Sequence, residues 1–139
     1  MGWAYRTFDG FGELFNEDET VIGLPFLLSF VEAEGLESEF LPLTTDQLRQ
    51  WTQQAFIGPP GCTAIAWDED LAGKDKLEAL VRLLDRAIDY LDQQTGQVPR
   101  AWIERREHWP VARSAGWEAT RVREAVAALR TFFTRPRDQ

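Results

Sequence analysis

The stretch KDKLEALVRLLDRAIDYLDQQT, residues 74–95, carries the strongest pattern in this sequence of 139 residues. Its aliphatic side chains recur at steps of three and four residues, the spacing that aligns them on one face of an α-helix. These side chains are Leu77, Leu80, Val81, Leu84, Ile88 and Leu91. The opposite side carries Asp85, Arg86, Asp89 and Asp92, and Gly96 ends the pattern. Such a helix is roughly 30 Å long, the width of a small domain, so we expect it to be central.

Four further helices are predicted by the residues that begin and end them. Proline fits a first helical turn, threonine caps a helix, and glycine or a following proline ends one. These signals predict helices over residues 26–34 between Pro25 and Gly35, after Thr44 or Thr45 as far as Gly58, between Pro99 and Pro110, and from about residue 117 to Pro136. The last has an apolar stripe of Val122, Ala125, Val126, Leu129, Phe132 and Phe133.

Two short segments have the character of strands. Near residues 2–8, a strand would place Trp3, Tyr5 and Thr7 on one side and Ala4, Arg6 and Phe8 on the other before Asp9-Gly10, a pair typical of turns. Residues 62–67 are apolar and lack helix signals. The pattern does not reveal a second strand in residues 11–15. We therefore expect one mainly α, bundle-like compact domain over residues 1–139, or an α+β variant with one or two short strands near 2–8 and 62–67.

Composition excludes several classes of protein. The one cysteine, Cys62, rules out an intrachain disulfide and favours a reducing compartment. The first residues do not resemble a secretion signal, and Pro25 and Ser29 interrupt the longest apolar run, residues 24–30. These features predict a cytoplasmic protein that does not enter a membrane.

The charge is unevenly distributed along the chain. The net charge is -8, yet the stretch between Arg6 and Arg49 has no basic residue and contains Asp9, Glu13, Glu17, Asp18, Glu19, Glu32, Glu34, Glu37, Glu39 and Asp46. Residues 100–139 instead carry nine arginines against five acids. Two explanations remain open: the acids dock a basic partner, or they pair internally with the C-terminal arginines. Nucleic acid is not an expected partner, because the sequence pI is about 4.7.

No motif for catalysis, metal or cofactor binding is complete. His108 and Glu104 would share a helical face but supply two ligands where zinc takes three or four. Residues 68–73 resemble the opening of a calcium loop, but its closing position holds Ala79 instead of a carboxylate. Cys62 has no histidine near it in sequence to activate its thiol. We expect no catalytic residue, no metal and no cofactor.

Six tryptophans indicate an aromatic core, a recognition surface, or both. The periodicity of its neighbours places Trp51 in the core. Trp67, beside three acids, and Trp109, beside Pro110, are the expected surface anchors, since tryptophan is enriched at binding hot spots.

These observations together favour an acidic module that caps or neutralises a basic protein, a character similar to that of bacterial immunity proteins and antitoxins as a class. The residues expected to bind the partner are Glu17, Asp18, Glu19, Glu37, Glu39, Trp67, Asp68 and Asp70. The alternatives are a small ligand-binding domain or enzyme whose site is assembled from distant residues, and a scaffold subunit of a larger assembly. The sequence leaves the oligomeric state open.

Overall fold

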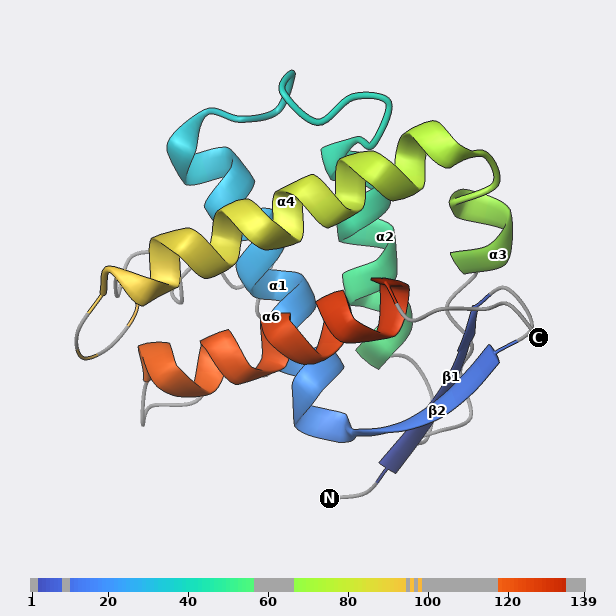
Figure 1. The fold of residues 1–139 in the computed structure, drawn as a ribbon, viewed down its shortest axis with the longest axis horizontal. Helices are drawn as coiled ribbons and strands as arrows, with labels where there is room; N and C mark the ends of the chain where they lie inside the picture. Colours follow the sequence, from blue (N-terminus) through green and yellow to red (C-terminus); the bar gives the residue numbers. More distant parts are fainter. Residues whose placement is uncertain are drawn as a thin grey trace.

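The computed structural model describes residues 3–8, 11–56, 67–94, 96, 98 and 118–134. Along the chain they form β1 (Trp3–Phe8), β2 (Phe11–Asn16), α1 (Glu17–Glu34), α2 (Thr45–Phe56), α3 (Trp67–Asp70), α4 (Lys74–Asp92) and α6 (Ala119–Thr134) (Figure 1). The expectation of a mainly helical domain is confirmed. The helix predicted between Pro99 and Pro110 lies outside the described residues, as do Cys62, Glu104, His108 and Trp109.

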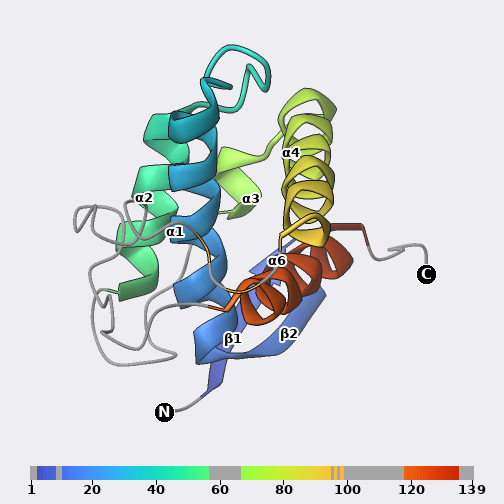
Figure 2. The ribbon, with the colours of Figure 1, turned by 90° about the vertical axis from the view of Figure 1, so that its left-hand side faces the viewer.

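The helix at the centre of the fold is α1, and the expectation that residues 74–95 would provide it was wrong. Figure 2 shows α1 between α2 and the α4–α6 pair, and α1 packs closely against both α2 and α6. Its residues Leu24, Phe26, Leu27, Leu28, Ser29, Phe30 and Val31 are all buried. Between Leu24 and Val31 the helix is buried on every side and needs no polar face, which is why this stretch of sequence shows no stripe.

This helix also begins earlier than its sequence signals predicted. It starts at Glu17 and continues through Pro25, which was expected to open it. Proline in a helix interior removes one hydrogen bond and crowds the preceding turn. Packing of α1 against α2, α6 and β2 outweighs that local preference. The predicted end is correct, because α1 stops at Glu34 and Gly35 follows with a positive φ of 67°.

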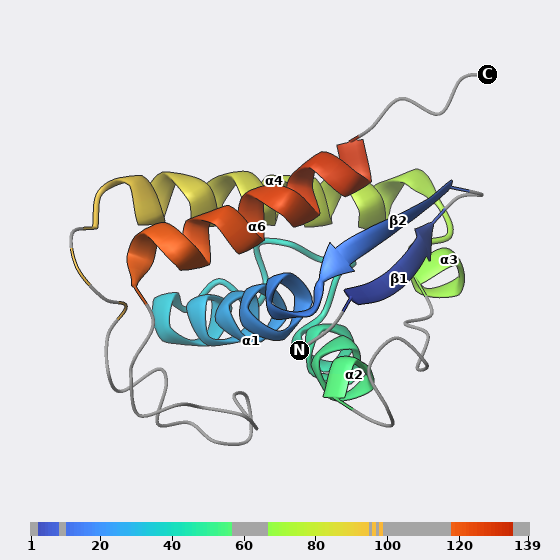
Figure 3. The ribbon, with the colours of Figure 1, turned by 90° about the horizontal axis from the view of Figure 1, so that it is seen from below.

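The two amphipathic helices α4 and α6 pack along each other (Figure 3). All six residues of the predicted α6 stripe are buried. On α4 the buried face is turned relative to the predicted stripe: Ala79, Leu83 and Ala87 are buried together with Leu80, Leu84 and Leu91, while the predicted Leu77, Val81 and Ile88 are only partly buried. The backbone N–H of Ala119 donates to the carbonyl of Gly96 at 2.7 Å and ties the start of α6 to the residues that follow α4.

A β-hairpin covers one end of the helices. β1 lies where alternation predicted a strand near 2–8, and it pairs antiparallel with β2 from Trp3 opposite Asn16 to Phe8 opposite Phe11. The sequence pattern missed β2. The other strand expected, near 62–67, falls outside the described residues except for Trp67, which begins helix α3.

Aromatic rings join the hairpin, α2, α3 and α6 into one core. The ring of Trp67 lies 6.3 Å from that of Trp51, 5.6 Å from Phe132 and 4.9 Å from Phe133. Phe133 in turn meets Phe8 of β1 edge to face at 5.3 Å. Both tryptophans are completely buried, so Trp51 is a core residue as predicted. Pairs of this geometry stabilise a fold beyond the area they bury.

Candidate protein-binding surface

The segment between α1 and α2, residues 35–44, forms a structured loop that we call the α1–α2 loop. The left-handed conformation of Gly35 lets the N–H of Leu36 donate to the carbonyl of Val31 at 2.9 Å, which closes the end of α1. At the other end, Thr44 accepts a hydrogen bond from the N–H of Gln47 at 3.2 Å and caps α2, as predicted. The loop is therefore fixed at both helix ends.

Three buried side chains anchor this loop and leave the residues between them exposed. The anchors are Leu36, Phe40 and Leu43, each no more than 5% exposed. Glu37, Ser38, Glu39 and Leu41 lie between them and face solvent. Leu41 is 56% exposed, and among the residues whose side-chain burial the structure describes (8, 23–54, 67–94, 96, 98 and 118–134) it is the one large hydrophobic side chain that is exposed. The loop therefore presents carboxylates and one apolar side chain on a firm base.

One row of side chains on α4 follows the loop. Arg82, Arg86 and Tyr90 are four residues apart, so they lie one above another on the same helical face. The guanidinium of Arg82 lies 5.7 Å from the centre of the Phe40 ring. Arg86 donates from Nη1 to Oε1 of Glu39 at 3.2 Å. The end of α1 and the loop that follows it therefore lie along α4 and run antiparallel to it.

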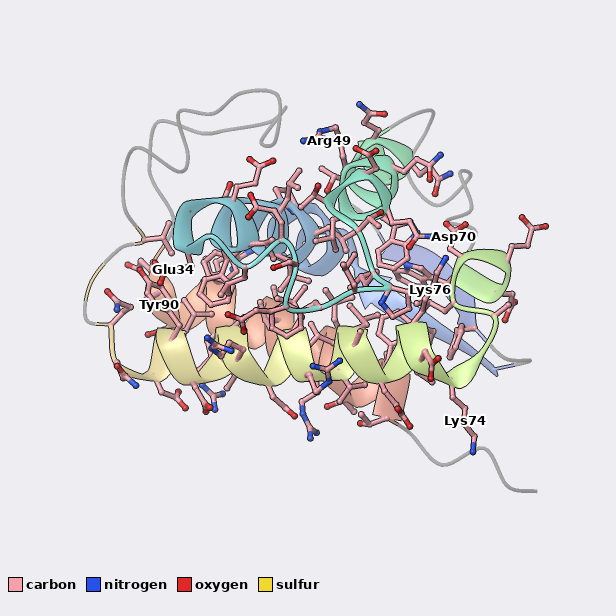
Figure 4. The ribbon with its side chains drawn as sticks, turned by 90° about the horizontal axis from the view of Figure 1, so that it is seen from above. Glu34, Arg49, Asp70, Lys74, Lys76 and Tyr90 are labelled. Atoms are coloured by element: carbon pink, nitrogen blue, oxygen red, sulfur yellow. The ribbon has the colours of Figure 1, made fainter. Side chains whose placement is uncertain are left out.

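The third member of this row, Tyr90, lies near the end of α1. Its ring is 5.2 Å from that of Phe30, and Figure 4 shows its side chain next to Glu34. Burial raises the pKa of the Tyr90 hydroxyl above its ordinary value near 10, and the negative charge of Glu34 raises it further. Both effects disfavour the tyrosinate, so Tyr90 is held in its neutral form.

The α2 side of the loop carries a further cation. Arg49 donates to Glu32 at 3.1 Å and to Asp46 at 3.0 Å, and the Asp46 side chain is 92% exposed. Around the loop, the carboxylates of Glu32, Glu34, Glu37, Glu39 and Asp46 therefore outnumber the guanidinium groups of Arg49, Arg82 and Arg86. The surface around the α1–α2 loop therefore carries an excess of negative charge. Glu34 and Glu37 are exposed and have no ion pair among the described residues.

The predicted partner-binding acids do not form one surface. Glu17, Asp18 and Glu19 occupy the first turn of α1, whereas Glu37 and Glu39 lie just beyond its other end (Figure 1). A helix of 18 residues is roughly 27 Å long, well beyond the ~8 Å over which charges interact at physiological salt. An acidic stretch that is continuous in sequence is therefore divided by α1 into two separate groups.

The prediction for Trp67 was wrong, and α3 has a structural role instead. Trp67 is fully buried, because the rings of Trp51, Phe132 and Phe133 pack against it. The carboxylate of Asp70 accepts a hydrogen bond from Nε1 of the buried Trp51 at 2.7 Å. The backbone carbonyl of Asp70 accepts another from the side-chain amide of Gln47 at 3.5 Å. Asp68 is exposed. Among the described residues no three His, Cys, Asp or Glu side chains are grouped as metal ligands.

Two C-terminal arginines pair with α4 rather than with the acidic N-terminal part. Arg123 donates to Asp92, and Arg130 donates to Asp85. The hydrogen bond from each arginine to its carboxylate raises the pKa of that guanidinium. These pairs line the contact between α4 and α6, while Arg49 and Arg86 pair with the N-terminal acids Glu32, Asp46 and Glu39 as described above.

Sequence reasoning did not select Leu41, Arg82, Arg86 or Tyr90 for this surface. A signal was present for the last three, because they repeat every four residues on the polar side of the α4 stripe. Leu41 had no such signal, since its exposure depends on the burial of its neighbours.

No helix within the described residues has the length and apolar character needed to cross a membrane. Comparison of the chain with protein-family models, with curated proteins and with solved structures found no match.

Proposed function

We propose that this domain is a binding module that caps a basic protein, as inhibitors of the immunity-protein or antitoxin class do, and that it docks through the α1–α2 loop. The observation that supports this most directly is the exposed Leu41 within a group of carboxylates on a loop held by three buried anchors. An apolar side chain surrounded by charge is the usual composition of a small interface core and its rim. A fixed loop loses little conformational entropy on binding.

The carboxylates and Leu41 make different contributions. Exposed acids increase the rate of association with a basic partner and lose this effect as salt screens them. Leu41 contributes affinity when the partner covers it; burying even part of such a side chain is worth about 1.4 kcal/mol, or tenfold in the dissociation constant. The two contributions can be measured separately.

The test begins with a tagged chain, used to capture proteins from cells that make it, and continues with the purified candidate. Association and dissociation rates are then measured for the wild type, for Glu34→Lys/Glu37→Lys and for Leu41→Ser. We expect the double reversal to slow association and the leucine substitution to speed dissociation. Glu118→Lys/Glu124→Lys is the matched control, because it makes the same charge change at exposed acids just before and within α6.

A second reversal separates the two ends of α1. Glu17→Lys/Asp18→Lys/Glu19→Lys changes the acids in its first turn, roughly 27 Å from the loop. Thermal unfolding of every variant shows whether the fold is intact. Binding that survives the loop reversal and is lost with the reversal at Glu17–Glu19 would place the interface at the other end of the helix and contradict the proposal.

A further inference from the structure

The contact between α4 and the α1–α2 loop already has the chemistry expected of a bound basic partner. A guanidinium, Arg86, meets the carboxylate of Glu39 at 3.2 Å, and a second, Arg82, lies 5.7 Å from the centre of the Phe40 ring. A carboxylate next to an aromatic ring is a favourable site for arginine, because the planar guanidinium forms hydrogen bonds with the former and stacks on the latter. Here both positions are filled from within the chain.

A cation from outside the chain can easily replace the two arginines in these internal contacts. The side chains of Arg86 and Glu39 are 51% and 50% exposed, so water screens their attraction and a competing cation can reach them. Arg82 is also exposed. Neither arginine belongs to the buried face of α4, which is formed by Leu80, Leu83, Leu84 and their neighbours. Displacing the two side chains would leave the packing of the helix unchanged.

We infer that Arg82 and Arg86 form an autoinhibitory contact: in the free protein they occupy the places on the loop that arginines of the partner take in the complex. This inference rests on the proposed function. It adds that the partner presents arginine rather than lysine to the loop, and that part of its binding free energy is spent on displacing the side chains of α4.

The experiment uses the full chain and a short, fluorescently labelled arginine-rich peptide as the probe, with binding followed by anisotropy. Arg86→Gln is expected to bind the probe about two- to fivefold more tightly than the wild type, the range of an exposed ion pair. Lys74→Gln is the matched control, because it removes the same charge at the far end of α4, where Figure 4 shows Lys74 pointing away from the other helices. An effect of the net charge of the protein alone would tighten both variants equally.

A lysine peptide of equal charge tests the second part of the inference and is expected to bind more weakly than the arginine peptide. Glu34→Lys/Glu37→Lys, compared with Glu118→Lys/Glu124→Lys, shows whether the probe uses the loop at all. Equal binding by these two double variants would overturn the proposed function. Loss confined to the loop variant, with Arg86→Gln no tighter than Lys74→Gln, would overturn the autoinhibitory contact alone. Lysine binding as tight as arginine would overturn the preference for guanidinium.

Discussion

Gly23 of α1 lies against Leu129 of α6, and this contact allows a quantitative prediction. A Cβ placed on Gly23 would lie 2.8 Å from Cδ1 of Leu129 on α6, whereas ordinary contact begins at 3.4 Å. Leu129 is 1% exposed and belongs to the packed core. Gly23→Ala therefore forces this methyl group to move by about 0.6 Å into side chains that already fill the space.

Two opposing effects determine the sign of the change in stability. Alanine is better than glycine in a helix interior by about 1 kcal/mol. Overpacking a core costs about 1 to 3 kcal/mol, and Leu129 has no exposed side toward which to turn. We expect a net loss of about 1 kcal/mol, or about 4 °C in melting temperature for a domain of this size.

A double-mutant cycle tests the cause. Leu129→Val removes the Cδ1 atom, so adding Gly23→Ala to that variant should leave only the gain in helix propensity. Urea unfolding of the four proteins should then show a favourable coupling free energy of about 1 to 3 kcal/mol. A Gly23→Ala protein that is more stable than the wild type, with no coupling to Leu129, would refute the close packing of α1 on α6.

Three further predictions concern single positions. Leu84→Ala should cost about 2 to 5 kcal/mol in urea unfolding because Leu84 is fully buried, and an unchanged midpoint would argue against this core. Asp70→Ala should cost about 1 to 3 kcal/mol because it leaves the buried Nε1 of Trp51 without an acceptor; Glu69→Ala, the exposed control in the same helix, should change stability little. The raised pKa of Tyr90 stabilises the fold below pH 10, and this contribution is lost as pH rises through the folded pKa. Tyr90→Phe should therefore lose less stability than the wild type above pH 10, and identical alkaline unfolding curves would exclude this role.

The sequence predicts those helices that bury one face, because that face appears as an apolar stripe among their own residues. The stripe of α6 and the threonine cap of α2 are local features, and both are found as expected. α4 was found at the predicted position for the same reason. An amphipathic helix needs only one partner surface, so its period remains visible whatever that partner is.

Tertiary structure decided what local pattern does not encode. α1 has no stripe and contains Pro25 because other elements surround it, so its length and central place depend on residues distant in sequence. Trp67 lies beside three acids yet is buried, because α2 and α6 bring their rings to it. β2 was missed since pairing with β1, rather than its own alternation, defines it.

For the candidate surface, the sequence by itself determined that the N-terminal part is acidic and that Glu37 and Glu39 belong to it. Only the tertiary structure decided three further features. It separated these acids from Glu17 by the length of a helix, it left Leu41 exposed among them, and it brought Arg86 into contact with Glu39. The physical reason is that charge adds up along a sequence regardless of distance, whereas its effect at a surface decays within about 8 Å at physiological salt and depends on which side chains folding brings that close.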